Sequence, residues 1–435
     1  MANTPKLRGA LIGTSLLATL AAASPALASG FYIQEQSARG AGRAYSGEVA
    51  DQGADSLWWN PAAIGGMTGS EGALNATAIL PRADVQDTGT GLLYPGQARP
   101  IAVGGNPLTH DPINNGVVPS GAIAHALTHN IAVGLALTAP YNFTTEYASD
   151  SWARYSALKT NLRTIDIQPS VAVMPVAGLS LGAAINIERT SAQLGNAVPN
   201  LSPLLPDGNE LLKGSGWDVG YSLGAQYAAG PLSLGVSYKS SIRHHLDGSL
   251  AITGLLGPVA SGNMSTSTSA SFATPWQLIF GGRLKVAKGV TLNAQATHSG
   301  WAKFDAIAIG APVNAAIPEG YHNTWNYSVG IDAEVLPTWT LRTGIQRDLS
   351  PVPGNARDQR VPDSNRWMVA AGASHAFSKR FTMDAAINYV MLDSAPINRN
   401  TGFYLGTPAA TYVLTSGQMT NASVLILSLG GRMKF

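Results

Sequence analysis

Cysteine is absent from this chain of 435 residues, and charged residues are scarce. Without cysteine the chain forms neither disulfide bridges nor thiolate metal sites, and the absence is compatible with export. Asp, Glu, Lys and Arg make up 12% of the residues, about half of the roughly 25% that is usual in soluble proteins. This composition and a net charge of +2 argue against a nucleic-acid binder and against a disordered chain.

Long apolar runs are also missing after residue 28, because prolines and charged residues interrupt them. A transmembrane helix needs about 20 mostly apolar residues, so this part of the chain has no helical route into a membrane. The first residues differ: Lys6 and Arg8 precede a short apolar core, and Ala26-Leu27-Ala28 fits a signal-peptidase site. We predict that residues 1–28 are a removed signal peptide, since the core is too short for an anchor.

Period-2 alternation dominates the chain from Glu71 onward. Apolar residues alternate with small or polar residues in the segments 179–188, 232–239, 327–335 and 383–391. These segments predict β-strands with one apolar and one polar face. The mean hydropathy of +0.07, with 45% hydrophobic residues and little charge, favours a membrane barrel over a soluble β-sandwich, whose surface would carry more charge.

The segment 71–435 is long enough for about fourteen tilted membrane-crossing strands, at roughly 25 residues for each strand and its loop. The strands must close into a barrel, because an open edge would leave unpaired backbone groups in lipid. Short turns are expected at 228–231, 286–289 and 377–380. Longer segments are expected at the outer face, at 84–119, 193–214, 251–271, 351–363 and 396–417.

The segment before these strands has the period of neither a strand nor a helix. It is rich in glycine, and its charged residues would be costly in lipid without polar partners: Glu35, Arg39, Arg43, Glu48, Asp51 and Asp55. A polar segment folded inside the barrel satisfies both features. We therefore predict that residues 29–70 form an N-terminal plug in the lumen and that residues 71–435 form the barrel.

Several sequence blocks, in order, resemble those of the FadL/TodX family of outer-membrane channels for long-chain fatty acids and other hydrophobic compounds. They are Asn60-Pro61-Ala62, Trp152–Tyr155, Tyr238–Ser240, Leu341–Gly344 and Val361–Arg366. The resemblance covers nearly the whole mature chain. It implies an all-β, transmembrane antiparallel barrel of about 14 strands with a plug, or hatch, in the outer membrane of a Gram-negative bacterium. The alternating last strand, which ends at Phe435, resembles the signal read by the barrel assembly machinery.

The resemblance also implies how a ligand is bound. In fatty-acid members, an Arg that ends an Ile-Glu-Arg run and a Lys after a Gly-aromatic pair meet the ligand carboxylate. Arg189 occupies the first position, and His322 replaces the lysine. Histidine is mostly neutral above its reference pKa of about 6.5. Charge-assisted contacts contribute about 1.5 to 3 kcal/mol, so Arg189→Ala is expected to weaken fatty-acid binding roughly ten- to a hundredfold.

Other predicted site residues come from the same resemblance and from the composition of two long loops. The family's wall opening lies in the third strand, where Pro140 cannot donate a hydrogen bond to its neighbour. Exposed leucines on loops mark a contact surface for the ligand, although internal loop packing explains them equally well. The predicted loop leucines are Leu201, Leu204, Leu205, Leu255 and Leu256, and the predicted plug and gating residues are Phe31, Asn60, Pro61, Ala62 and Pro140.

The sequence thus predicts uptake of hydrophobic small molecules, with long-chain fatty acids first and aromatic hydrocarbons as the alternative. Outer-membrane lipids are the other expected partner, and a monomer without cofactor, metal or nucleic acid is expected. A general porin is disfavoured because a plug would block free flow. Two G-x-S-x-G segments, 178–182 and 220–224, keep a barrel hydrolase as a rival, but their serines lie on strands rather than at a strand-to-helix turn.

Overall fold

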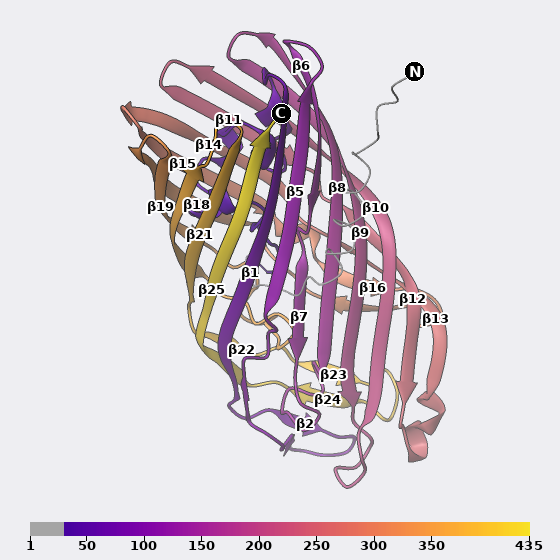
Figure 1. Cartoon of the computed structure of the whole chain (residues 1–435). Helices are drawn as coiled ribbons and strands as arrows, with labels where there is room; N and C mark the ends of the chain where they lie inside the picture. The colour runs from indigo at the N-terminus through magenta and orange to yellow at the C-terminus, as the bar shows by residue number, and fades with distance from the viewer. Residues whose placement is uncertain (1–29) are drawn as a thin grey trace, which may run out of the picture.

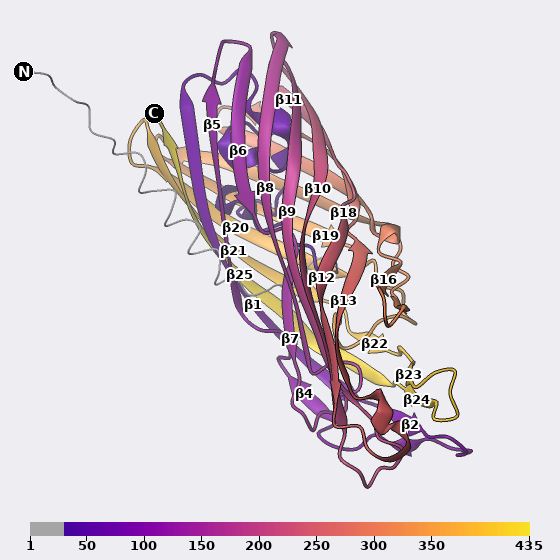
Figure 2. The same cartoon turned by 90° about the vertical axis from the view of Figure 1, so that its right-hand side faces the viewer.

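The protein is a closed antiparallel β-barrel of 14 crossing strands (Figures 1 and 2). The computed structural model describes residues 30–435. The barrel closes where β1 (Ser70–Asp87) pairs with β25 (Gly417–Lys434), from Glu71 opposite Lys434 to Asp87 opposite Gly417. The predicted fold class is confirmed. The predicted signal peptide, residues 1–28, lies outside the described residues. Within residues 30–435, no helix is long and apolar enough to cross a membrane.

Some crossings are single strands and others are two segments separated by a break. The single strands besides β1 and β25 are β5 (Gly116–Ala126), β8 (Lys159–Val176), β9 (Leu179–Val198), β10 (Gly208–Ala229), β19 (Trp339–Asp348) and β20 (Arg366–Ala376). The split crossings are β6 (Ile131–Thr138) with β7 (Asn142–Glu146), β11 (Leu232–Lys239) with β12 (Arg243–Thr253), β13 (Met264–Ala273) with β14 (Trp276–Ala287), β15 (Val290–Gly300) with β16 (Ala306–Ile309), β17 (Ala315–Pro318) with β18 (Thr324–Leu336), and β21 (Phe381–Leu392) with β22 (Ala395–Ile397).

The alternating apolar and polar residues of the sequence lie on the outer and inner faces of the barrel wall, respectively. On β9, Leu181 and Ile185 are 42% and 52% exposed on the outside, whereas Asn186 and Glu188, which have the opposite phase, are buried inside. Strand side chains point alternately to opposite faces, so the apolar residues at alternate positions from Leu179 to Ile187 face the membrane. This alternation fixes which residues can reach the lumen.

The two ends of the barrel differ. Short turns and the C-terminus lie at the upper end in Figure 1, and the long connections lie at the lower end. There β4 (Leu108–His110) continues the barrel wall, and β2 (Gly91–Leu93), β3 (Ile101–Ala102), β23 (Thr401–Phe403) and β24 (Thr411–Leu414) form a small separate sheet. The predicted loops 193–214 and 251–271 are largely strand, because β9, β10, β12 and β13 extend beyond their expected ends.

The segment before β1 lies inside the ring of strands (Figure 2) and is almost entirely buried. Its helical turns are α2 (Ala38–Ala41), η2 (Glu48–Ala50), η3 (Ala54–Ser56) and η4 (Pro61–Ile64); two further turns, η5 (Gly257–Gly262) and η6 (Trp301–Lys303), belong to barrel connections. We call residues 30–36 the arm and residues 37–69 the hatch body. Leu57, Trp58, Trp59 and Ile64 of the hatch body belong to one hydrophobic core with the inner wall.

Asn60-Pro61-Ala62 fastens the hatch body to the wall. The Asn60 Oδ1 atom accepts a hydrogen bond from the Ala62 amide, and its Nδ2 donates to the Val49, Ala225 and Val236 carbonyls at 2.7, 3.2 and 3.3 Å. The wall admits this turn because Gly224 lies opposite, where an added Cβ would overlap the Asn60 side chain. The hatch body is therefore joined to β10 and β11 through one amide side chain.

Candidate functional site: a luminal cavity and the arm that closes the wall

An apolar cavity of about 60 Å³ lies in the lumen on the long-loop side of the hatch body. It is lined by side chains from the arm and from several strands, including Phe31, Phe143, Leu162, Leu246, Phe272 and Phe304. Ligand pockets for drug-sized molecules measure roughly 300 to 1,000 Å³. In this state the cavity is too small for a long-chain ligand, so a ligand has to displace part of its lining.

Phe31 of the arm lines the cavity among four aromatic rings of the wall. Its ring centre lies 4.9 Å from that of Trp301, 5.1 Å from Phe304 and 5.8 Å from both Tyr141 and Phe143. These separations are those of favourable edge-to-face and tilted aromatic pairs. Phe31 therefore fills the space that a ligand ring or chain would occupy next to the cavity.

The same arm closes a break in the wall. The third crossing is interrupted at Ala139-Pro140-Tyr141, and β5 pairs with β6 only from Gly121 onward. The Ile33 amide donates to the Pro140 carbonyl at 2.8 Å. A buried backbone group without a hydrogen-bond partner is costly. The arm therefore supplies the amide donor that a neighbouring strand would supply elsewhere in the barrel.

Gln36, at the end of the arm, completes the closure. Its Nε2 donates to the Ala139 carbonyl at 3.1 Å, its Oε1 accepts from the Ala139 amide at 3.3 Å, and its carbonyl accepts from the Ser120 hydroxyl at 2.8 Å. A groove of about 680 Å³ in the wall borders this place and is lined in part by Ser120, Leu137, Val117 and Leu429. The arm thus separates the luminal cavity from an apolar groove in the barrel wall.

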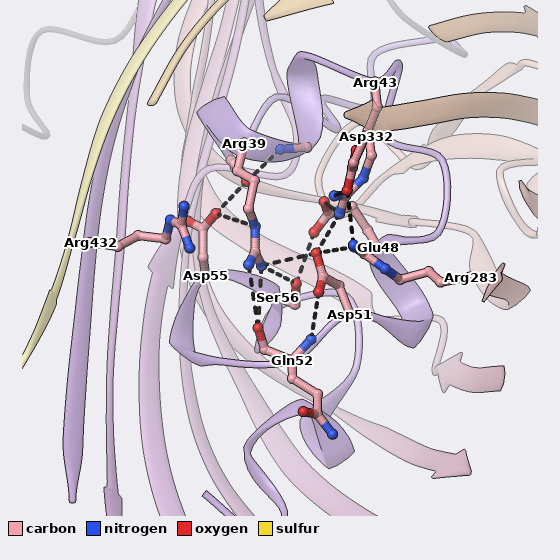
Figure 3. A network of polar contacts seen from close by, with 12 residues as sticks. Arg39, Arg43, Glu48, Asp51, Gln52, Asp55, Ser56, Arg283, Asp332 and Arg432 are labelled. Atoms are coloured by element: carbon pink, nitrogen blue, oxygen red, sulfur yellow. Dashed lines mark hydrogen bonds and ion pairs between the residues drawn. The ribbon is translucent and has the colours of Figure 1, made fainter. Parts of the chain in front are cut away.

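Ion pairs hold the hatch body against the strands at the short-turn end (Figure 3). Arg43 is fully buried and pairs with Glu48, with Asp51 at 2.6 Å and with Asp332 of β18 at 3.1 Å. Arg283 of β14 also pairs with Asp51 and Asp332. Removing one partner of a buried ion pair costs about 3 to 5 kcal/mol, so this network resists movement of the hatch body.

The arm, in contrast, contains a carboxyl group without an ion pair. Glu35 is 1% exposed, and neither carboxyl oxygen has a side-chain hydrogen-bond partner among residues 30–435. Burial raises the pKa of Glu35 from 4.5 to about 7; the Glu35 and Gln34 amides and Arg366 lower it, and Asp348 raises it. Tyr32 and Tyr45 are the other titratable groups near it.

The docked arm should therefore loosen as pH rises. An undocked Glu35 has an ordinary pKa, so the docked state binds its proton more tightly. Docking free energy is then lost between about pH 4.5 and 7, by roughly 3 kcal/mol in total. We expect maleimide labelling of an introduced Ile33→Cys, relative to a Leu204→Cys control on an exposed loop, to increase over this range. Glu35→Gln should remove the increase; labelling that stays parallel to the control in the unsubstituted protein would contradict it.

The structure does not bring the two predicted head-group residues together. Arg189 lies on the outward phase of β9, where its guanidinium is 5.8 Å from the Trp217 ring and donates to the Ser215 hydroxyl at 2.8 Å. The inward residues beside it are Glu188 and Thr190. Strand alternation explains this placement, since Arg189 has the same phase as Ile185. Arg189 as a luminal ligand residue stays a prediction that its position does not support.

His322 also points away from the cavity. It is exposed, and its amide donates to the Pro351 carbonyl at 3.0 Å. The preceding residue, Tyr321, is buried instead, with its ring 4.9 Å from that of Phe304 and 5.6 Å from that of Trp301. The aromatic member of the Gly-Tyr-His run therefore packs against Phe304 of the cavity lining, whereas the histidine is exposed.

The predicted loop leucines divide into two groups. Leu255 is buried and Leu201 packs against the same small cluster with Val198 and Val259. Leu204, Leu205 and Leu256 are 93%, 40% and 41% exposed. Leu201 and Leu255 therefore take part in internal loop packing. Leu204, Leu205 and Leu256 form an exposed apolar surface.

Sequence reasoning missed most of the cavity lining. Phe143, Leu246, Phe272 and Phe304 were not predicted as site residues, although all line the cavity and are buried in the luminal core. One signal was present: Leu246 has the inward phase of His244, so a large apolar residue replaces the polar residues expected on the luminal face. Such a change of pattern in the outer half of a strand indicates an apolar pocket.

Comparison with known proteins decides the family. The profile of the family described as "Outer membrane protein transport protein (OMPP1/FadL/TodX)" matches residues 19–435. The chain belongs to this family. It is 27% identical over 404 residues to the "Long-chain fatty acid transport protein" of Salmonella typhi, which covers 86% of this chain and 90% of that protein. The protein is accordingly a transport protein of the outer membrane of Gram-negative bacteria.

Solved structures show the same fold. A crystal structure described as that of a Pseudomonas aeruginosa FadL homologue has a TM-score of 0.81 and 22% identity, covering 93% of this chain and 100% of that one. The Ralstonia pickettii toluene transporter TbuX has a TM-score of 0.65 and 16% identity, covering 92% and 99%. The barrel described above is therefore the fold of the FadL/TodX family.

Proposed function

We propose that this protein takes up hydrophobic molecules with a long apolar chain, long-chain fatty acids among them, and releases them sideways through its wall. One observation carries the proposal: the arm both lines the luminal cavity, through Phe31, and closes the wall break, through Ile33 and Gln36. A ligand that displaces Phe31 therefore also removes the hydrogen bonds that close the wall. The likeness to curated fatty-acid transport proteins supports this substrate class.

The steps follow from the positions of the apolar surfaces. Exposed Leu204, Leu205 and Leu256 on the long loops receive the molecule, and the cavity then holds it by apolar burial, at about 25 cal/mol per Å². The arm moves, and the molecule leaves through the break at Pro140 into the outer membrane. The hatch body stays in place because Asn60 and the Arg43 ion pairs hold it.

Aromatic hydrocarbons are the second candidate. The cavity lining contains no charged side chain among the described residues, so a neutral ring is accommodated without a head-group site. Saturable entry of toluene that fatty acids do not inhibit would favour this candidate.

Catalysis is no part of the proposal, since Ser180 of one G-x-S-x-G segment donates to the Ala62 carbonyl and holds the hatch. We propose a monomer in contact with outer-membrane lipids, with Phe435 as the signal for the assembly machinery.

Replacement of Arg189 distinguishes the cavity from the family's carboxylate site. Because the guanidinium lies on the outer face against Trp217, Arg189→Ala should change fatty-acid affinity by less than about twofold. A head group bound at this residue would instead lose roughly ten- to a hundredfold. Titration of the purified barrel with a fluorescent fatty acid measures the difference. A loss of tenfold or more would place the head group at Arg189 and overturn the cavity as its site.

A further inference from the structure

On the short-turn side of the cavity, three carboxylates form a row across three neighbouring strands on the inner wall. Asp166 of β8 lies directly opposite Glu188 of β9, and Glu188 lies directly opposite Asp218 of β10. Like charges that face each other across strands destabilise a sheet. Three carboxylates in one row therefore need compensating partners or serve a function.

The partners within the protein are incomplete. His244 of β12 is fully buried between two of the carboxylates, with Nε2 3.4 Å from Glu188 Oε2 and Nδ1 3.4 Å from Asp218 Oδ2. Lys239 at the end of β11 is 9% exposed, and its Nζ lies 3.4 Å from the centre of the Trp58 ring. We call these five residues the polar cluster: Asp166, Glu188, Asp218, Lys239 and His244.

Several atoms of the polar cluster have no hydrogen-bond partner among residues 30–435. They are Asp166 Oδ1, Glu188 Oε2, Lys239 Nζ and His244 Nε2, and all four side chains are at least nine-tenths buried. Buried polar atoms normally have hydrogen-bond partners, because leaving one unpaired is energetically costly. Free acceptors beside a free donor are suited to a small polar group that both donates and accepts hydrogen bonds.

The polar cluster adjoins the apolar cavity. The His244 ring centre is 5.2 Å from that of Phe272, a cavity-lining residue, and Leu246, two residues further along β12, lines the cavity as well. Arm residues cover both regions: Phe31 lines the cavity and packs on Tyr141, and Tyr32 stacks at 6.0 Å on Trp58, the ring that Lys239 contacts. Displacement of the arm therefore joins the cavity to the polar cluster.

We propose that the polar cluster receives the head group of the transported molecule, and that this head group is a neutral hydrogen-bond donor, such as an alcohol or an un-ionised carboxylic acid. A neutral head group is favoured over an anionic one because three carboxylates face one ammonium group, so a further anion would be repelled. This inference rests on the proposed uptake through the cavity. It adds the chemical class of the head group and the residues that select it.

Displacement of a fluorescent apolar probe from the purified barrel tests the inference with three ligands of equal chain length: an alcohol, its methyl ether and an ionised carboxylate. The alcohol should bind about tenfold tighter than the ether, which cannot donate, and the carboxylate should bind most weakly. In Asp166→Asn/Glu188→Gln, Lys239 loses its neighbouring charges. The carboxylate should then bind about tenfold tighter than it binds the unsubstituted protein. Arg189→Gln, one residue away on the opposite face, should behave like the unsubstituted protein.

The outcomes separate the inference from the proposed function. Equal displacement by all three ligands, or a double variant that keeps the order of the unsubstituted protein, would overturn the polar cluster and leave the cavity intact. If none of the three ligands displaces the probe, the cavity itself is not the binding site and both proposals fail. The methyl ether controls for folding, because it cannot donate to the carboxylates that the double variant removes, so its affinity should change least among the three ligands.

Discussion

A disulfide between cysteines introduced at Tyr32 and Tyr141 is expected to stop uptake, and reduction is expected to restore it. The two residues form an isolated antiparallel bridge between the arm and the wall break, so the bond would hold the arm in its closed position. The chain has no other cysteine, and the pair can therefore form only this bond. Transport of a labelled fatty acid, measured before and after reduction in the same preparation, gives the result without a change of sequence.

A second cysteine pair controls for the presence of a disulfide. Thr77 of β1 and Ser428 of β25 are paired, with their hydroxyl oxygens 2.9 Å apart. A bond there joins two strands on their luminal side without holding the arm, and should leave uptake unchanged. If oxidation of the Tyr32–Tyr141 pair leaves uptake at the level of this control, the arm does not have to move.

Phe31→Ala should produce the opposite effect, a wall that opens without a ligand. Loss of a buried phenylalanine costs about 3 to 5 kcal/mol, and here most of that free energy belongs to docking of the arm on Trp301, Phe304 and Tyr141. A change of about 3 kcal/mol shifts the docking equilibrium more than a hundredfold toward the open arm. Entry of a hydrophobic dye into cells should increase and become independent of competing fatty acid.

Phe377→Ala is the matched control for this substitution. Phe377 lies at a short turn and is 61% exposed, so its removal affects neither the cavity nor the arm. Dye entry in this variant should equal that of the unsubstituted protein. A Phe31→Ala barrel that excludes the dye as well as this control does would show that another part of the plug closes the wall.

The barrel was predictable because strand alternation is a local property of the sequence. Leu181, Ile185 and Leu234 face the membrane as their phase requires. The closure of β1 on β25 followed from the physics of lipid, in which no strand edge can stay unpaired. Strand ends were less predictable: the polar residues around Ser267 suggest a loop, yet this stretch is paired in β13 because it extends beyond the apolar band.

The candidate site was predictable only where one residue determines the structure. Pro140 indicated the break, since proline cannot donate to a neighbouring strand. Arg189 was selected by its resemblance to family members, although its phase on β9 directs it outward. The cavity lining, the polar cluster and the contacts of Gln36 depend on which strands become neighbours in space. Glu188 and His244, for example, are far apart in sequence and meet only in the folded barrel.

The route of exit is the central claim, and photolabelling tests it most directly. A fatty acid with a photoreactive group at its chain end, activated during uptake in outer membranes, marks the residues it passes, and mass spectrometry identifies them. We expect labels on the wall groove at Val117, Leu137 and Leu429, and we expect them to disappear when the Tyr32–Tyr141 disulfide is formed. Labels on the hatch body at Arg39, Asp51 and Met67, which persist under oxidation, would contradict lateral exit and show passage through the hatch to the periplasm.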